Sequence, residues 1–175
     1  VLRSEFTAME NTPEDDPAWK LFYIRCALMR RKTRFEDVKD KIAKIIFTKH
    51  FDMGGSHYAY TEALSDAYEE RRFEPGSALC LFTLNDSLLG TIDTLLYDKE
   101  GVIRDPDISF DGKTILFAWK KGDRSDDYHL YEMTIHNKSI RQLTFGLGHA
   151  DYEGIYLPNG NILFKLYSDS ILVYS

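Results

Sequence analysis

Short runs of aliphatic, β-branched and aromatic residues, separated by turn residues, fill the chain from Ala43 onward. Runs of this length and composition predict β-strands. The Gly, Asn and Asp residues between them favour tight antiparallel connections. The segment 51–60 is expected to be a structured loop, and 62–72 a short helix or an exposed excursion. The predicted strands comprise residues 44–49, 78–84, 91–97, 108–110, 114–120, 129–135 and 140–143.

The first 42 residues follow a helical period instead. Apolar residues recur there at intervals of three and four, which is typical of one face of an amphipathic helix. An Asp-Pro pair at 16–17 marks the helix start, and the helix is predicted to end near residue 31. A Thr-x-x-Glu capping box at 33–36 predicts a second short helix to about residue 41. Residues 1–16 are expected to form a polar lead-in. The apolar face comprises Trp19, Phe22, Tyr23 and Cys26.

An imperfect repeat connects two parts of the strand-rich region. Residues 107–117 return as 153–164, each copy with an apolar run, an Asp-Gly or Asn-Gly turn, and a β-rich run that ends in Phe. Gly112 and Gly160 are 48 residues apart, within the period of about 40–50 residues of propeller blades. Four short antiparallel strands form one blade, and residues 105–145 supply the clearest set.

The predicted fold class is therefore mainly β. It is a partial β-propeller with two to three four-stranded antiparallel blades, preceded by one or two N-terminal helices. We expect residues 1–42 to form the polar segment and the helices, and residues 43–175 to form the incomplete set of blades. A second such blade begins at Asp151 and runs out of chain at Ser175.

Three elements resemble the blade motif of TolB-like propellers. The segment 105–113 contains the Ser-x-Asp-Gly-Lys turn, Leu130–Met133 matches the Leu-Tyr-x-Met strand, and Arg141–Thr144 matches the usual blade ending. The match covers roughly residues 105–164. This resemblance implies a β-propeller that binds a ligand or a partner protein.

A longer and looser resemblance is to bacterial proteins related to the propeller domain of the hydrazine synthase alpha subunit. It implies a large exported protein, periplasmic or extracellular, and only the namesake is tied to haem redox chemistry. A complete propeller needs about six blades and this chain offers two to three, so the resemblance also implies that the chain is a fragment. The residues that carry it are Ile46–His50, Gly55–His57, His149–Tyr152 and Tyr156–Gly160.

Composition narrows the classes of partner. The net charge is −6, with 28 acidic and 22 basic residues, and this argues against broad nucleic-acid binding. A basic cluster at 30–34 is interpreted as a helix end whose cations lie near the negative pole. No apolar run approaches the length of a transmembrane helix. Cys26 and Cys80 are predicted to be small buried hydrophobes, and either one disulfide or none is compatible with the sequence.

Three histidines and one aspartate are candidate metal ligands: His50, His57, His149 and Asp151. They are predicted in loops or at strand ends, and loops at one end of a propeller converge on its central channel. Imidazole is the commonest protein metal ligand. Two interpretations stay open, a His/Asp metal site or ordinary hydrogen-bonded loop histidines. No cofactor other than this metal ion is expected.

Other chemistry has less support. Covalent haem attachment needs Cys-x-x-Cys-His, and neither that motif nor a Gly-x-Ser-x-Gly elbow or a phosphate loop occurs in the sequence. The spacing of Asp105, Asp107 and Asp111 differs from a calcium loop and fits turn chemistry. Tyr58, Tyr60 and Tyr152 are predicted as exposed ligand-binding aromatics, with ordinary strand tyrosines as the alternative.

The first functional hypothesis is a ligand- or protein-binding propeller module of a larger exported bacterial protein, with no catalysis of its own. Its partners are an unknown ligand or protein and other blades or domains of the same parent chain. The second hypothesis is a metal- or haem-dependent redox domain, implied only by the longer resemblance. A propeller that gates a hydrolase domain outside this chain is the third.

Overall fold

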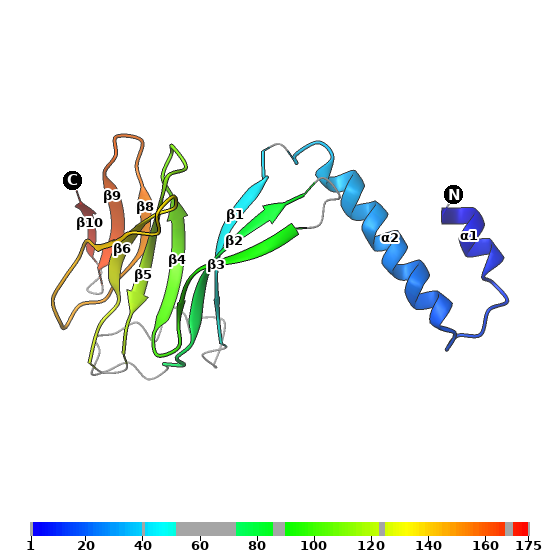
Figure 1. Ribbon diagram of the computed structural model, residues 1–175, viewed down its shortest axis with the longest axis horizontal. Coiled ribbons are helices and arrows are strands. Elements are labelled where there is room, and N and C mark those ends of the chain that lie inside the picture. The colour runs from blue at the N-terminus through cyan, green and yellow to red at the C-terminus, as the bar shows by residue number, and fades with distance from the viewer. Residues whose placement is uncertain are drawn as a thin grey trace. The chain divides into compact units, whose positions relative to one another are not determined.

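A computed structural model describes residues 2–39, 41–51, 73–85, 90–122, 125–166 and 170–174 (Figure 1). These residues form two helices and ten strands. The chain divides into two compact units. The first contains Val1–Lys44 with Thr83–Thr91, and the second contains Ile45–Phe82 with Ile92–Ser175.

Helix α2 spans Pro17–Phe35 and begins as the sequence predicts. Asp16 is the N-cap, and its Oδ1 accepts a hydrogen bond from the Ala18 N–H at 2.8 Å. The predicted second helix is wrong because α2 continues through Thr33. The Thr33 hydroxyl donates to the Met29 carbonyl, one turn earlier in the same helix, at 3.1 Å, and so does not form the expected cap.

A helix that the sequence did not predict, α1, spans Leu2–Ala8. Its Phe6 ring lies 6.1 Å from the rings of both Trp19 and Phe22 on α2. The Trp19 indole N–H also donates to the Pro13 carbonyl at 3.0 Å, which fixes the connection between the two helices. Neither helix is long and apolar enough to cross a membrane.

The strands form three sheets. Their orders are β1-β2-β3, β4-β5-β6-β7 and β10-β9-β8. The predicted mainly β, partial propeller-like fold class is thus confirmed, although only the middle sheet has four strands among the described residues. The strands are β1 Lys44–His50, β2 Ser77–Leu84, β3 Gly90–Asp98, β4 Val102–Ile108, β5 Thr114–Lys120, β6 His129–Thr134, β7 Ile140–Gln142, β8 Asp151–Tyr156, β9 Ile162–Leu166 and β10 Ser170–Tyr174.

Strand β4 begins six residues earlier than the sequence predicts, at Val102 rather than Ile108. Pro106 and its acidic neighbours obscure the strand pattern, since proline inside a run argues against a strand. The structure accommodates them in a β-bulge between Arg104 and Asp107, where Asp105 adopts φ +50°. The same geometry returns on β8, with a register shift between Tyr152 and Ile155 and with Glu153 at φ +53°.

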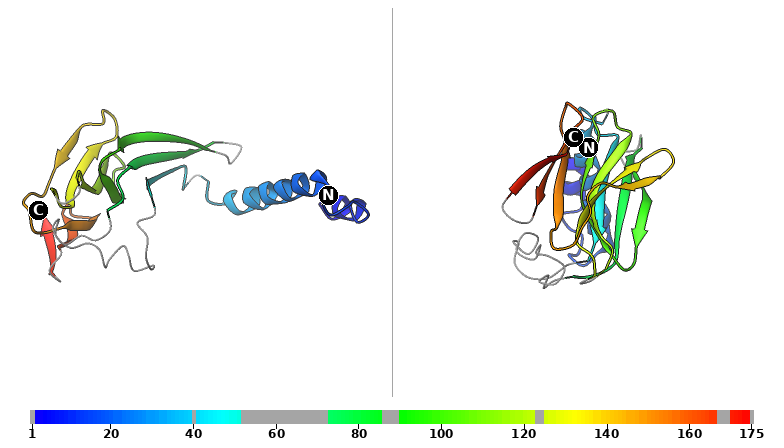
Figure 2. Two further views of the ribbon diagram at one scale, coloured as in Figure 1. Left: turned by 90° about the horizontal axis from the view of Figure 1, so that it is seen from below. Right: turned by 90° about the vertical axis from the view of Figure 1, so that its left-hand side faces the viewer.

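The middle sheet is buried on both faces, because alternate residues of a strand point in opposite directions. On β5, Ile115 and Phe117 join a core with Leu79 of β2, whereas Leu116 and Ala118 join a separate core. The second core also contains residues of β8 and β9, including Tyr152 and Phe164. The sheets therefore pack face to face as successive layers, like blades (Figure 2).

Candidate functional site

The histidines that the structure describes at strand ends lie at one common end of the sheets. β1 ends at His50, β6 begins at His129, and β8 begins at Asp151, two residues after His149. The Asp151 N–H donates to the Tyr128 carbonyl at 2.7 Å, which brings the starts of β6 and β8 together. This end is the lower one in Figure 1 and is called the lower end below.

His129 occupies the centre of a buried histidine–aspartate cluster at the lower end. Its Nε2 lies 3.5 Å from Asp126 Oδ1, and its Nδ1 lies 3.6 Å from Asp151 Oδ2. The His129 and Asp151 side chains are almost completely buried, and Asp126 is partly exposed. We include Asp127 in the cluster because it immediately precedes the Tyr128–His129 pair and is also buried.

Asp127 attaches the loop before β8 to the loop before β6. Its Oδ2 accepts a hydrogen bond from the Gly148 N–H at 2.7 Å. Among the described residues, Asp127 Oδ1 and His129 Nδ1 are buried without a hydrogen-bond partner. Buried polar atoms in such positions are commonly satisfied by an ordered water molecule. The hydrogen bond between Gly148 and Asp127 joins the two loops.

The structure separates the predicted metal ligands into different environments. Asp151 is buried against His129, whereas His149 is exposed. His50 Nδ1 lies 2.9 Å from the Phe51 carbonyl oxygen, and His57 is outside the described residues. In the described part of the chain, no three His, Cys, Asp or Glu side chains are arranged to hold a metal ion. The metal site, which includes His57, stays a prediction.

Tyr152 is buried rather than exposed, so the expectation of its exposure is wrong. Its ring faces two cations, with the Arg104 guanidinium carbon 5.7 Å and the Lys165 Nζ 5.6 Å from its centroid. Burial raises the pKa of the Tyr152 phenol, and Lys165 opposes that rise. Tyr58 and Tyr60 are outside the described residues. The ligand-binding role of the three tyrosines stays a prediction.

The aspartates before the first Asp-Gly turn have structural partners. Asp105 Oδ2 accepts a hydrogen bond from Arg104 Nε at 2.7 Å, and Asp107 Oδ2 accepts one from the Tyr156 N–H at 2.7 Å. Asp111 lies in the turn itself, where the Ser109 hydroxyl and then the Lys113 N–H hold the pKa of its carboxyl below the usual value. These contacts agree with the turn chemistry that the sequence indicates.

A cavity of about 480 Å³ opens on the β1–β2–β3 sheet. Its volume lies within the usual range for ligand pockets, about 300–1,000 Å³. Cys80 and Ala78 on β2 are buried in its lining, while Ile92 and Tyr97 on β3 leave most of their surface exposed. We call this the β-sheet cavity. Its remaining lining residues are Phe47, Lys49, His50, Phe51, Gly76, Ser77 and Thr94.

A glycine and a serine hydroxyl shape one side of the β-sheet cavity. Gly76 has φ +105°, and a Cβ there would lie 2.8 Å from the Phe51 ring, so glycine allows the ring to lie against the main chain. Ser77 Oγ donates to the Gly101 carbonyl at 3.2 Å and accepts from the Ile103 N–H at 2.8 Å. The start of β2 is thereby fixed to the start of β4.

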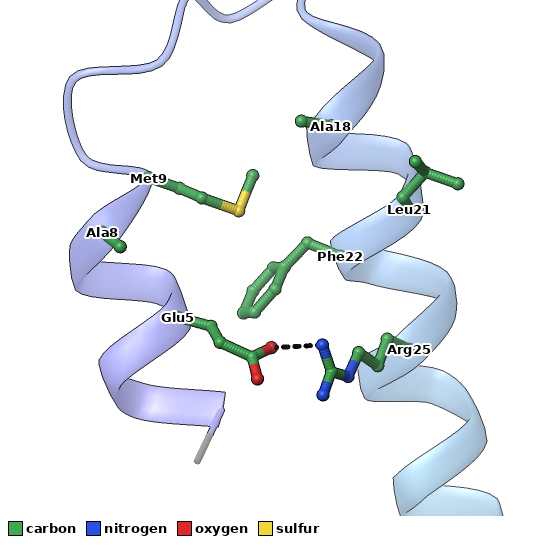
Figure 3. Close-up of a pocket in the computed structure, with 7 residues that line it drawn as sticks. All are labelled: Glu5, Ala8, Met9, Ala18, Leu21, Phe22 and Arg25. Atoms are coloured by element: carbon green, nitrogen blue, oxygen red, sulfur yellow. Dashed lines mark ion pairs between the residues drawn. The ribbon is translucent and has the colours of Figure 1, made fainter.

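A second cavity of about 420 Å³ lies beside the two helices. In Figure 3 the Phe22 side chain of α2 points toward α1, and the Glu5 carboxylate meets the Arg25 guanidinium. The Glu5 Oε2 to Arg25 Nη1 distance is 3.0 Å. This pair is partly exposed, so it orients the helices more than it stabilises them.

Two predicted site residues belong to these features: Asp151 lies in the histidine–aspartate cluster, and His50 lines the β-sheet cavity. The sequence gives His129 no role, because a histidine inside a strand pattern carries no signal about its neighbours. The β-sheet cavity had a weak signal, since β1 to β3 have apolar residues at both odd and even positions. Such strands are apolar on both faces, and one of these faces lines the β-sheet cavity.

Comparisons with known proteins give a likeness in structure. No protein-family model matches the chain. No curated protein matches it either. Among solved structures, it is similar to TolB from Acinetobacter baumannii, with 21% sequence identity and a TM-score of 0.41 over 55% of this chain. The match spans 23% of that TolB, about a quarter of its length.

Proposed function

We propose that this chain is a binding module without catalysis of its own, and that it takes up a polypeptide segment in the β-sheet cavity. One observation carries the proposal. The β1–β2–β3 sheet packs one face against the middle sheet, and its other face, which no described element covers, has a cavity of ligand-binding size. The TolB-like blade motif of residues 105–164 supports a binding role. The longer resemblance, to relatives of the hydrazine synthase alpha subunit, implies an exported protein, and we place the module outside the cytoplasm as part of the same proposal.

The two faces of the β1–β2–β3 sheet differ in their surroundings. Leu79 of β2 and Ile46 of β1 pack against the middle sheet. Cys80, the next residue of β2, lines the β-sheet cavity on the opposite face. Ile92 and Tyr97 of β3 are 61% and 65% exposed beside it. Apolar side chains so exposed around a concavity are typical of a binding surface.

The chemistry of the lining indicates which segment would bind. Phe47, Phe51 and Ile92 supply apolar surface, which favours aliphatic or aromatic side chains in the cavity. Among the described residues of the lining, Lys49 and His50 are basic and none is acidic. A segment with apolar side chains and a neighbouring carboxylate would therefore match both parts of the lining.

Selection from a random peptide library on the immobilised chain tests this proposal. We expect enriched peptides to contain apolar residues next to Asp or Glu. Ile92→Glu places a carboxylate at the cavity and should weaken peptide binding at least about tenfold. The new carboxylate removes apolar surface from the cavity and repels the Asp or Glu of the peptide. Phe145→Glu is the matched control, since Phe145 is 74% exposed and does not line the cavity.

Two results would overturn the proposal. One is a selection in which no peptide is enriched over an uncoated surface. The other is a set of peptides that bind wild type, Ile92→Glu and Phe145→Glu with equal affinity. Circular dichroism of both variants confirms that the sheets are intact, which we expect because both side chains are exposed.

A further inference from the structure

Helix α2 carries a charge opposite to that of the whole chain. It contains six basic residues and no acidic residue, whereas the chain has a net charge of −6. Cations in the last turn are explained by the helix dipole, which favours them there. The dipole does not explain Lys20 and Arg25, which lie in the first half of the helix. The basic residues are Lys20, Arg25, Arg30, Arg31, Lys32 and Arg34.

The same helix exposes apolar side chains on a second face. None of its 19 residues is buried. Trp19 and Phe22 face Phe6 of α1, but Leu21 and Leu28 are 68% and 48% exposed. In Figure 3 the Leu21 side chain points away from α1. Ile24, which is 43% exposed, lies between the two leucines, and we call these three residues the leucine stripe.

Basic residues border the leucine stripe on both sides. At 100° per residue, Leu21, Ile24 and Leu28 fall within a sector of about 60° of the helix. Lys20 and Arg31 lie along one border, and on the other border lie Arg25 and Lys32. The two borders run over about three turns, so cations accompany the stripe along its whole length.

We infer that the leucine stripe docks on the surface of an anionic lipid bilayer, with α2 parallel to the membrane plane. An amphipathic helix of this kind places its apolar side chains about 5–10 Å into the boundary between headgroups and acyl chains. Lys and Arg at both borders then meet the anionic headgroups, and their long apolar stems reach past the buried side chains. The leucine stripe thus matches the acyl chains of such a surface, and its basic borders match the anionic headgroups.

Two other acidic surfaces fit the observations less well. A nucleic acid would pair with the basic borders but would leave the leucine stripe in water. An acidic protein helix would need a groove along the stripe. The cavity beside α1 reaches Leu21 but neither Ile24 nor Leu28, and the acidic Glu5 in its lining would repel an acidic partner. A bilayer needs no groove, because its lipids adapt to the side chains that enter.

Four acidic residues beside α2 do not interrupt this surface. Glu5 pairs with Arg25 from α1 at 3.0 Å. Asp16 is occupied as the N-cap of α2, and Glu36 and Asp37 follow the helix after its last turn. Arg31 also lies over the Phe35 ring at 5.6 Å, which extends the apolar side by one further turn.

Vesicle flotation with the full chain tests the inference. We expect the chain to float with vesicles of phosphatidylcholine mixed with phosphatidylglycerol, and not with phosphatidylcholine alone. Leu21→Ser with Leu28→Ser should lower the partition coefficient at least about tenfold, because two apolar side chains no longer enter the bilayer. Tyr23→Ser with Met29→Ser is the matched control, since both are exposed residues outside the stripe. This control should bind as wild type does.

Charge variants and competing probes complete the test. The double variant Lys20→Gln with Arg31→Gln should weaken vesicle binding about tenfold. A higher salt concentration should also weaken the binding of the wild type, because salt screens the attraction to anionic headgroups. Equal binding to neutral and anionic vesicles would overturn the inference. So would equal losses in the stripe variant and its control. Binding to duplex DNA or polyglutamate as tight as to vesicles, with no effect of the leucine substitutions, would assign the surface to general electrostatics instead.

Discussion

The carboxylate of Asp107 on β4 accepts a hydrogen bond from the backbone N–H of Tyr156 on β8, with an oxygen–nitrogen distance of 2.7 Å. The two residues are 49 positions apart and belong to different sheets. Tyr156 adds a second link, because its hydroxyl donates to Glu132 Oε1 at 2.7 Å and lies 3.1 Å from the Thr114 hydroxyl. Polar contacts therefore join the middle and third sheets alongside their shared apolar core.

Asp107→Ala should lower the free energy of unfolding by about 1–3 kcal/mol, because the Tyr156 N–H would lose its acceptor at a partly buried position. Asp107→Asn keeps a carbonyl oxygen at the same place and should cost about 1 kcal/mol or less. Urea denaturation measures both. Equal losses in the two variants would show that the carboxylate contributes by its charge and not as an acceptor.

Gly154→Ala should destabilise the chain by about 1–3 kcal/mol through overpacking. A Cβ at this position would lie 2.8 Å from Leu116 Cδ2 and 3.2 Å from Leu130 Cδ2, and both leucines are buried. Phe145→Ala is the control, because Phe145 is 74% exposed and its truncation leaves the packing around Leu116 and Leu130 unchanged. Thermal denaturation should show a large shift only for Gly154→Ala. A shift of equal size in both would contradict the close packing of these sheets.

Alkaline pH should destabilise the fold through Tyr131. Burial, and then the Asp126 carboxylate, raises the pKa of its phenol from 10 to about 12. The unfolded chain loses this proton near pH 10 while the folded chain keeps it. The free energy of unfolding therefore falls as pH rises from 10 to about 12, by up to about 1.4 kcal/mol per pH unit for one group.

Tyr131→Phe removes this titration and should flatten the decline in unfolding free energy above pH 10. Tyr23→Phe, at a position that is 70% exposed, is the matched control and should retain the wild-type decline. Urea titrations at several pH values between 9 and about 12 measure the difference. If Tyr131→Phe declines as steeply as Tyr23→Phe, Tyr131 is not responsible.

The two cysteines are free thiols and should react at different rates. Cys80 is buried in the lining of the β-sheet cavity, whereas Cys26 on α2 is partly exposed. Iodoacetamide should therefore modify Cys26 at least about tenfold faster, since access limits the reaction. Mass spectrometry of peptides gives both rates, and chain unfolded in urea should show them nearly equal. Equal rates in the folded chain would indicate that the cavity opens more widely than the structure shows.

The elements with a strong local pattern were predicted well. β5 and β6 are rich in aliphatic and aromatic residues and follow Asp-Gly and other turn residues, and the structure places them within one residue of the predicted bounds. α1 was missed because its seven residues have little helical signal of their own, and a helix this short depends on packing. The packing comes from Phe6, whose ring meets Trp19 and Phe22 only after the chain has folded back.

The candidate sites were harder to predict. His129 and Asp151 are 22 positions apart in sequence, and their contact depends on how β6 and β8 pack across two sheets. The metal hypothesis contains His57, and the tyrosine hypothesis contains Tyr58 and Tyr60, all outside the described residues. These hypotheses and the longer resemblance to relatives of the hydrazine synthase alpha subunit stay predictions.

The sequence by itself determined the period of each element and the positions of its turns. Gly112 and Gly160, for example, mark turns with φ +70° and +86°, which residues with a Cβ rarely adopt. Those are local properties of the backbone, so they can be deduced without knowing the fold. The tertiary structure alone decided which faces are covered: Leu79 enters a core while its neighbour Cys80 lines an open cavity. Alternation assigns these residues to opposite faces of the strand, but only the packing of the sheets determines what lies against each face.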